Sequence, residues 1–403
     1  EEEDSEEEGL KGEIGKIFAV KGLGAEQVVL VKYNGLSHHH NHWVSARDVL
    51  EVKPQLLKSF LGRHGVTGEF VDENGHPNGI NPDWLKMDRV IGTRLRRGST
   101  EYLVKWASYP YTESTWEPQS DMDNAKELIS AYHTYNSPSR SVSDMEKSGR
   151  RRRKVPSDGD DMPLPSFLND RKLRDYQEIS LKWNLSNWSQ GRNCILGDEM
   201  GLGKTAQSIA VLEAQRQFCG FKGPFLIVAP LTTLGHWKRE IETWTPMKCI
   251  LYSGTGEDRK LIQEYEMKVP ARKAGGRKEL GTRFDVMLTS YENLRMDIGF
   301  LKNFYWHSAI MDEAHRLKSV AGQTRQAIVA LNIDWLLLLT GTPIQNNLSE
   351  LFGLLNLLDP ERYGSKEEFD ERFGADGVPS PDQIGELQAA LRPILLRRMK
   401  EDV

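Results

Sequence analysis

The sequence contains no run of eighteen apolar residues, so we expect no membrane-spanning helix. It shows no signal peptide, and it begins at Glu1 rather than at methionine, which predicts a fragment or a processed chain. Cysteine is scarce. Cys194, Cys219 and Cys249 are the only three, and their spacing matches no metal site or disulfide framework. We therefore expect reduced thiols in an intracellular protein.

The excess of acidic charge is confined to the start of the chain. The chain carries 58 acidic and 53 basic side chains, and the opening segment EEEDSEEE holds seven of the acids. Such a block is typical of a solvated tail, which we predict for residues 1–9. A segment that masks a basic surface or contacts a basic partner is the alternative. The 403 residues suffice for two or three domains with cores of their own.

The first part of the chain contains an internal duplication. When the sequence is shifted by 73 positions, LVKY at residues 30–33 falls on LVKW at residues 103–106, and Trp43 falls on Trp116. Each copy has short alternating segments followed by a helical stretch. We therefore predict two small modules, each an antiparallel sheet with a helix. Their predicted bounds are residues 10–62 and 82–136, with helices at about 46–60 and 123–135.

Two linkers are predicted from composition. Residues 63–81, between the copies, are rich in Gly, Asn, Pro and Asp. Residues 137–166 are rich in Ser, Pro, Asp and Arg and have no periodicity, which favours an exposed linker. This second linker contains the run RRRRK at residues 150–154. We favour a nuclear localisation signal or a DNA backbone contact over a merely solvated segment.

From residue 167 onward the pattern predicts an α/β domain, residues 167–403, with a parallel sheet. Continuous apolar runs alternate with helical stretches, which is typical of strands buried on both faces. Nearly every run ends in a polar motif, and ligands bind at the carboxyl ends of strands in such folds. The predicted strands are residues 194–196, 225–228, 285–288, 309–311 and 336–339.

A glycine-rich loop, DEMGLGKT, follows the first of these runs and precedes a helical pattern. This arrangement predicts a phosphate-binding loop that opens a helix. Lys204 would neutralise phosphate charge, and the Thr205 hydroxyl would ligate Mg²⁺. Asp198 stands where the general pattern has glycine. The predicted nucleotide-binding residues of the loop are Asp198, Glu199, Met200, Gly201, Leu202, Gly203, Lys204 and Thr205.

Two further motifs follow later strands. In DEAH at residues 312–315, Asp312 is predicted to hold Mg²⁺ and Glu313 to orient the attacking water. His315, which follows Ala314, would link this acidic site to its neighbours, and an ordinary acidic strand cap is the alternative. The segment LTGTPIQNN at residues 339–347 supplies small hydroxyl residues that can sense a phosphate. Lys204, Asp312 and Glu313 are the predicted catalytic residues.

DEMGLGKT, DEAH and LTGTPIQNN, in this order, resemble motifs I, II and III of Snf2-type chromatin-remodelling ATPases of helicase superfamily 2. In that family Asp at position 198 is normal. The resemblance implies that Gln177, in LRDYQ, reads the adenine, and that residues 229–237 and 288–292 track DNA. Residues 395–403 resemble the stretch that leads to a second lobe. Because that lobe supplies arginine fingers, we expect this chain to bind nucleotide but hydrolyse it slowly.

The duplicated modules resemble tandem chromodomains, the second copy more strongly through YLVKW and STWEP. Tandem chromodomains before a Snf2 ATPase resemble the chromodomain-helicase-DNA-binding family. In heterochromatin-type chromodomains an aromatic cage binds methyl-lysine. Trp84, Trp106 and Tyr109 are the candidate cage of the second copy, whereas the first copy has Gly12, Tyr33 and Leu36. Core packing and gating of the ATPase remain the alternatives.

The resemblance implies an ATP- and Mg²⁺-dependent enzyme of the nucleus that moves DNA on nucleosomes. Its expected partners are nucleosomal DNA and histones, including a methylated H3 tail at the second module. Two alternatives stay open: a chromatin-reading scaffold with a weakly active lobe, and a superfamily 2 ATPase acting on RNA or bare DNA. The histidine-rich loop at residues 38–42 is predicted to be a surface loop rather than a zinc site, because it has no cysteine pair beside it.

Overall fold

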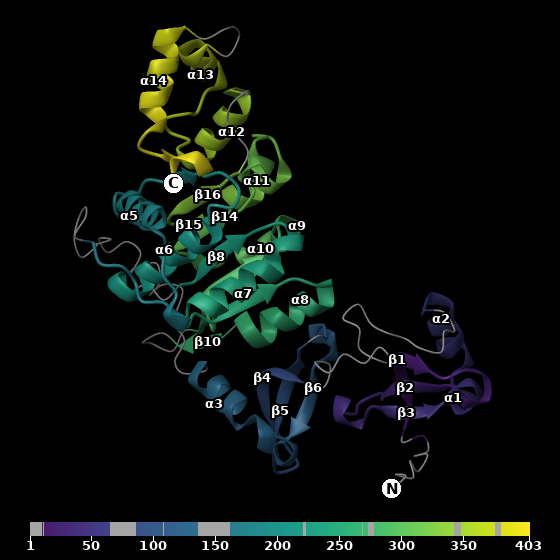
Figure 1. Cartoon of the computed structure of the whole chain (residues 1–403). Coiled ribbons are helices and arrows are strands. Elements are labelled where there is room, and N and C mark those ends of the chain that lie inside the picture. Colours follow the sequence, from purple (N-terminus) through teal and green to yellow (C-terminus); the bar gives the residue numbers. More distant parts are fainter. Residues whose placement is uncertain are drawn as a thin grey trace. The chain divides into compact units, whose positions relative to one another are not determined.

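The computed structural model describes residues 10, 12–64, 86–107, 109–135, 162–220, 223–267, 269–272, 278–341, 348–374 and 380–403, and it has two compact units (Figure 1). The first unit comprises residues 1–137 and 254–265, and the second comprises residues 138–253 and 266–403. Three predicted features lie outside the described residues: the acidic tail, the basic run at 150–154, and Trp84. Within the described ranges, no helix is long and apolar enough to cross a membrane.

The first module is a three-stranded antiparallel sheet in the order β1 (Ile14–Lys21), β2 (Val28–Tyr33) and β3 (His42–Ser45). Two helices follow, α1 (Ala46–Val52) and α2 (Pro54–His64). The single helix predicted for residues 46–60 is therefore wrong. Proline lacks an N–H and disfavours helical geometry in the residue before it, so the helix breaks ahead of Pro54.

The second module repeats this sheet with β4 (Met87–Arg96), β5 (Ser99–Trp106) and β6 (Thr115–Pro118), followed by α3 (Lys126–Tyr135). A 3₁₀ turn at residues 123–125 precedes α3, so the predicted helical stretch is only partly α-helical. Irregularities of register fall between Ile14 and Lys16 in β1 and between Met87 and Arg89 in β4. These positions are 73 residues apart, so the duplication extends to the β-bulges.

A buried lysine occupies the same position in both modules. Lys32 is 8% exposed and donates to the Tyr33 carbonyl at 3.0 Å, and Lys105 is 6% exposed and donates to the Trp106 carbonyl. Each ammonium thus satisfies carbonyl groups of the turn after the middle strand, which offsets the cost of its burial. Burial lowers the pKa of Lys32, although Glu113 and Glu117 oppose that shift.

A short segment far along the chain belongs to the first unit. Helix α8 (Gly256–Ile262) contributes Asp258, whose carboxylate accepts a hydrogen bond from the Thr112 backbone at 2.9 Å. The Tyr265 ring lies edge-on to Trp116 at 6.4 Å, and Arg94 covers the same tryptophan at 4.1 Å. Residues 254–265 therefore pack with the second module, although the sequence places them between strands of the second unit.

The second unit is built on a seven-stranded sheet whose strand pairs are all parallel, as predicted. Every residue of the five strands that match the anticipated apolar runs is buried, whereas Asp285, the predicted start of the third, lies outside its strand and is half-buried. In sheet order the strands are β17 (Leu395–Leu396), β7 (Cys194–Leu196), β16 (Leu336–Leu339), β14 (Ser308–Met311), β8 (Phe225–Val228), β12 (Val286–Thr289) and β9 (Cys249–Tyr252).

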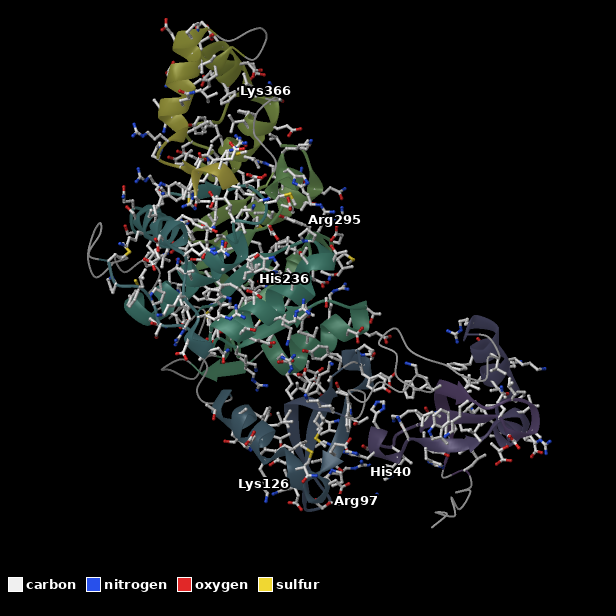
Figure 2. The ribbon with its side chains drawn as sticks, in the orientation of Figure 1. His40, Arg97, Lys126, His236, Arg295 and Lys366 are labelled. Atoms are coloured by element: carbon white, nitrogen blue, oxygen red, sulfur yellow. The ribbon has the colours of Figure 1, made fainter. Side chains whose placement is uncertain are left out.

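Three long helices bury one face of this sheet. Residues of α5 (Asp175–Ser189), α6 (Lys204–Cys219) and α7 (Leu234–Trp244) form one core with alternate strand residues such as Phe225 and Ile227. Buried side chains of α7 recur at Leu234, Trp237, Ile241 and Trp244, the spacing of one helical face. In Figure 2, His236 marks α7 and Arg295 marks α9 (Tyr291–Met296).

The described part of this unit has further α-helices and strands. They are α10 (Ile298–Leu301), α11 (Gln323–Val329), α12 (Leu348–Leu358), α13 (Lys366–Phe373), α14 (Pro381–Leu391), the hairpin of β10 (Val269–Arg272) and β11 (Lys278–Gly281), and the pair β13 (Tyr305–Trp306) and β15 (Asn332–Ile333). Helices α12, α13 and α14 share a separate apolar cluster around Phe352 and Phe369. All three cysteines are described, and none of them forms a disulfide bond.

Candidate nucleotide site

The glycine-rich loop connects β7 to α6 and has two glycines with positive φ. Gly201 has φ 94° and Gly203 has φ 76°, values that L side chains rarely adopt. Gly203 immediately precedes α6, which begins at Lys204 and is sixteen residues long. The loop therefore turns tightly and presents the amino end of a long helix, where unpaired N–H groups favour an anion.

Lys204 is held by its own loop. Its ammonium donates to the Asp198 carbonyl at 2.7 Å and approaches the Glu199 carbonyl at 3.4 Å. Burial lowers the pKa of Lys204, while the carboxylates of Asp198, Glu313, Asp312 and Glu199 oppose that shift. The Lys204 ammonium is therefore attracted electrostatically by carboxylates of both predicted motifs. Partners that are only backbone carbonyls can be exchanged for phosphate oxygens.

Hydrogen bonds to the Leu202 carbonyl also hold the loop in place. It accepts hydrogen bonds from the Tyr176 hydroxyl at 3.2 Å, from the Gln177 amide at 3.2 Å and from the Gln207 amide at 3.0 Å. Gln177 is 7% exposed, and its side-chain oxygen accepts from the Arg174 backbone. The structure therefore places Gln177 against the phosphate loop at the start of α5.

The contacts of Asp198 explain why the loop has an aspartate where the general pattern has glycine. Its carboxylate has no exposed surface. It accepts hydrogen bonds from Arg398 Nε at 3.1 Å, from Arg398 Nη2, and from the Gln207 amide at 3.2 Å. Arg398 also donates to the Tyr176 carbonyl. A bidentate charged pair of this kind is strong and directional. The first residue of the loop is thereby joined to the chain that follows β17.

Backbone contacts extend this connection. The Gly197 N–H donates to the Leu396 carbonyl at 2.7 Å, and the Glu199 N–H donates to the Arg398 carbonyl at 2.9 Å. The Glu199 carboxylate accepts from the Lys400 backbone at 2.8 Å. The backbone pairing between β17 and β7 therefore continues along the loop, so the loop and residues 396–398 hold each other in position.

The acidic motif follows β14 at the same edge of the sheet. One oxygen of the Asp312 carboxylate accepts from the Trp237 indole at 2.9 Å, and the other accepts from the Glu313 N–H at 2.9 Å. The Tyr291 hydroxyl donates to the Asp312 carbonyl at 2.6 Å. Each carboxylate oxygen is oriented by one donor and keeps a free lone pair, which suits a hydrated Mg²⁺ ion.

Glu313 adopts a left-handed backbone conformation with φ 51°. This conformation is unfavourable for a residue with a side chain and is held only by its surroundings. The carboxylate lies 3.2 Å from His315 Nδ1, and Ala314 between them is fully buried. The third motif also reaches the loop: a Cβ built on Gly341 would lie 2.7 Å from Met200 Cγ and 3.5 Å from Lys204 Nζ. Residues 342–347 of that motif lie outside the described residues.

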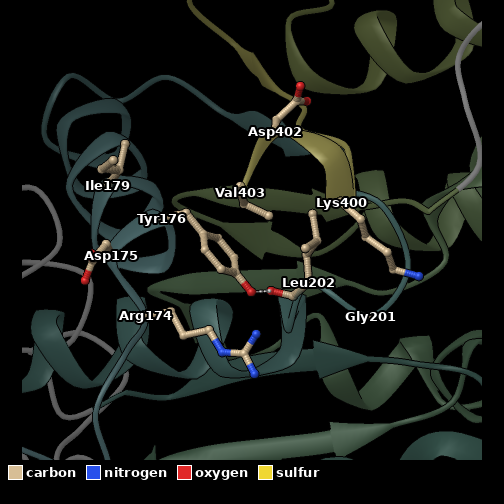
Figure 3. A pocket seen from close by; sticks show the side chains of 9 residues that line it. All are labelled: Arg174, Asp175, Tyr176, Ile179, Gly201, Leu202, Lys400, Asp402 and Val403. Carbon is tan, nitrogen blue, oxygen red and sulfur yellow. Dashed lines mark hydrogen bonds between the residues drawn. The ribbon is translucent and has the colours of Figure 1, made fainter.

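An open cavity adjoins the phosphate loop on the side of α5 (Figure 3). Its volume is about 760 Å³, within the range of small-molecule sites. The Tyr176 ring lies beside it, with its hydroxyl joined to the Leu202 carbonyl. The lining residues are Arg174, Asp175, Tyr176, Ile179, Gly201, Leu202, Lys400, Asp402 and Val403.

The SNF2-related domain model matches residues 176–403, which contain the loop, the acidic motif and seven of the nine residues that line the cavity. The chain belongs to the SNF2-related family. A second model, the chromo (chromatin organisation modifier) domain, matches residues 86–134 in the second module. SNF2-type proteins are helicase-like ATPases, so the family implies ATP as the nucleotide.

Curated relatives are named chromodomain-helicase-DNA-binding proteins. The chain is 37% identical over 391 residues to chromodomain-helicase-DNA-binding protein 6 of Mus musculus and 38% identical over 386 residues to protein 7 of Homo sapiens. These alignments cover 94% and 93% of this chain but 14% and 12% of the relatives, so the chain spans about an eighth of their length. The resemblance to that family predicted from the sequence is confirmed.

A solved structure agrees with the fold of the SNF2-related unit. The Sulfolobus solfataricus SWI2/SNF2 ATPase core in complex with double-stranded DNA matches with 29% identity and a TM-score of 0.50. The match covers 60% of this chain and 47% of that one. The predicted fold class, small sheet modules before a parallel-sheet lobe, is confirmed.

The SNF2-related site contains residues that the sequence interpretation missed. Trp237 and Tyr291 lie in segments assigned to DNA tracking, yet they are 1% and 3% exposed and hold Asp312 from inside the unit. Arg398 was matched only as part of the stretch toward a second lobe. No local sequence pattern indicates these pairings, because the partners are 75, 21 and 200 positions apart.

We expect Trp237→Phe to raise the Mg²⁺ concentration needed for half-maximal ATP turnover about tenfold, because a hydrogen bond to a charged group contributes roughly 1.5–3 kcal/mol. The measurement is a Mg²⁺ titration of turnover in the full-length protein. Trp244→Phe is the matched control: Trp244 lies on the same face of α7 and donates to Glu240 instead. Equal Mg²⁺ curves for the two variants would contradict a positioning role for Trp237.

Proposed function

We propose that the SNF2-related unit binds ATP and hydrolyses it to drive DNA translocation on nucleosomes in the nucleus. The observation that carries this proposal is the convergence of a phosphate loop and an acidic motif at one edge of a parallel sheet. Lys204 is flanked by the carboxylates of both motifs. In folds of this class, that edge is where nucleotides bind.

The loop residues have distinct roles in this proposal. Backbone N–H groups of residues 199–205, at the amino end of α6, would receive the phosphates. Lys204 would exchange its carbonyl partners for β- and γ-phosphate oxygens and so neutralise charge that develops during transfer. Gln177, which already contacts the loop, would read the adenine, and the cavity beside Tyr176 has the volume for a nucleoside.

The donor set at the acidic site fits Mg²⁺. The Thr205 hydroxyl on the first turn of α6 and the Asp312 carboxylate are hard oxygen ligands, and Asp312 keeps a lone pair on each oxygen. A bound Mg²⁺ would neutralise the phosphate charge. Glu313 would orient the attacking water, and His315 at 3.2 Å would hold the Glu313 carboxylate in place.

Chromatin as the setting is supported by the chromo match and by the chromodomain-helicase-DNA-binding relatives. DNA is supported by the Sulfolobus relative, whose core was solved with double-stranded DNA. The proposed partners are therefore nucleosomal DNA and histones. If the protein is instead a reader scaffold without turnover, sliding should not need Lys204. If it is an enzyme acting on RNA, RNA should stimulate ATP turnover most.

Nucleosome sliding by the full-length protein tests the proposal. We expect Lys204→Ala to abolish sliding and to weaken ATP binding strongly, because the loop loses its only cation. Lys302→Ala is the control, since Lys302 is an exposed lysine after α10. Sliding by Lys204→Ala at the wild-type rate would support the scaffold and overturn the proposal.

A further inference from the structure

One histidine of the loop at residues 38–42 is not on the surface. His38 has no exposed surface, whereas its neighbours His39 and His40 are exposed. The prediction of a plain surface loop is therefore wrong for His38. No group of three or more metal-binding side chains occurs in the described part of the chain, so a metal does not explain this burial.

The His38 ring is inserted between aromatic rings of the second module. It stacks on Tyr109 with ring centroids 4.4 Å apart and an interplanar angle of 21°. It meets Trp106 edge-on at 5.4 Å and 68°. Phe18 of β1 lies 5.1 Å from Tyr109 and 5.8 Å from His38. Trp106 and Tyr109 are the two described members of the candidate methyl-lysine cage, and we call them, with Phe18 and Glu113, the aromatic pocket.

Polar contacts fix the imidazole within the aromatic pocket. His38 Nε2 lies 3.2 Å from the Glu113 carbonyl, and His38 Nδ1 lies 3.2 Å from the Asn41 amide nitrogen. An amide N–H can only donate and a carbonyl can only accept, so these partners select the neutral tautomer with its proton on Nε2. Both ring nitrogens are satisfied, which burial of the ring requires.

Other contacts join the same surfaces. Lys16 of β1 forms an ion pair with Glu113 at 3.1 Å, and Phe18 packs against the apolar core of the second module. His39 meets the Trp106 ring edge-on at 5.1 Å. The contact between the two modules therefore contains aromatic, polar and charged interactions, with His38 at its most buried point.

A methylammonium group would need the same aromatic faces and the same carboxylate that His38 already contacts. Such a ligand binds over aromatic faces, here those of Trp106 and Tyr109, and gains from a nearby carboxylate. The Glu113 carboxylate lies 3.6 Å from His38 Nε2. We propose that the aromatic pocket, to which both modules contribute, is the binding site of the His38 imidazole, and that His38 excludes methyl-lysine from it. This inference is independent of the nucleotide site.

Ligand titration tests the exclusion. The probes are N-acetyl-trimethyl-lysine amide and its unmethylated analogue, titrated into the full-length protein with tryptophan fluorescence as the signal. We expect wild type and His40→Ala to bind trimethyl-lysine at least about tenfold more weakly than His38→Ala, a difference of about 1.4 kcal/mol. Wild-type binding as tight as that of His38→Ala overturns the proposal. Absence of binding in all three variants also overturns the exclusion, because removal of the imidazole would then open no methyl-lysine site.

Hydrogen exchange tests the occupancy separately. His38→Ala and Tyr109→Ala are each expected to speed amide exchange both in β5 and in residues 38–42, because either change breaks the contact from one side. His40→Ala should leave both segments unchanged. If His38→Ala affects only its own loop, the ring does not occupy the pocket in solution and the proposal is wrong.

The contact is also expected to depend on pH. Burial, with a contribution from Lys32 and a smaller one from Lys16, lowers the pKa of His38 to about 4, although Glu113 opposes the shift. Because an unfolded histidine has a pKa of about 6.5, the neutral contact is fully formed above that pH and weakens as pH falls toward 4. Protection factors in β5, which correct for the slower intrinsic exchange at low pH, should therefore fall more between pH 6.5 and 4.5 in wild type than in His38→Ala; an equal fall would exclude His38 as the titrating group.

Discussion

Arg398→Ala is expected to lower the free energy of unfolding of the SNF2-related unit by about 3–5 kcal/mol, the usual cost of leaving one member of a buried ion pair alone. Asp198 has no exposed surface, and the Arg398 side chain is 14% exposed. Without the guanidinium, the carboxylate keeps only the Gln207 amide as a side-chain donor. Urea unfolding followed by tryptophan fluorescence measures the change.

The chain offers a control and a rescue for this experiment. Arg397 is the adjacent arginine, and its contact is a weak one to Met399 sulfur at 3.9 Å, so Arg397→Ala should cost little. Asp198→Asn in the Arg398→Ala background should recover part of the loss, because it removes the uncompensated charge. If Arg397→Ala is as destabilising as Arg398→Ala, the ion pair does not brace the phosphate loop.

Glu313→Gln is expected to reduce the rate constant of ATP hydrolysis by about 10²–10⁴, the range found when a group that activates the nucleophile is lost. The amide has the shape of the carboxylate but cannot polarise water as a base. Because Glu313 is not a proposed phosphate ligand, ATP affinity should stay within about threefold of wild type. Turnover and nucleotide binding in the full-length protein measure the two quantities.

His315→Ala is the graded comparison for that variant. His315 approaches Glu313 at 3.2 Å without a proposed contact to the reacting atoms, so its loss should lower hydrolysis less than Glu313→Gln does. A Glu313→Gln protein that hydrolyses ATP at the wild-type rate would remove the water-orienting role from Glu313. Loss of ATP binding together with turnover would instead give Glu313 a binding role.

The sequence predicted the parts of the fold that local patterns encode. Strands buried on both faces read as apolar runs, so β7, β8, β12, β14 and β16 were anticipated together with the motifs at their ends. The edge strand β9 and the two-residue β17 were not, because short segments at a sheet edge have no distinctive pattern. The break before Pro54 is likewise encoded locally, by the proline itself.

Long-range pairings account for what the sequence did not predict. Gly201 and Gly203 carry their own conformational signal, and both have the positive φ that the loop requires. Arg398 and Asp198 are 200 positions apart, and His38 and Glu113 are 75 apart. A single sequence contains no local pattern for such pairs, since they arise only when separate elements pack together.

The most direct test of the central claim is ATP turnover by the full-length protein with nucleosomes, naked DNA and RNA as alternative activators. The account predicts the highest turnover with nucleosomes, an intermediate value with DNA, and little stimulation by RNA. It also predicts that Glu313→Gln removes the stimulation while ATP still binds. RNA as the best activator, or nucleosome-stimulated turnover that survives Glu313→Gln, would contradict the account.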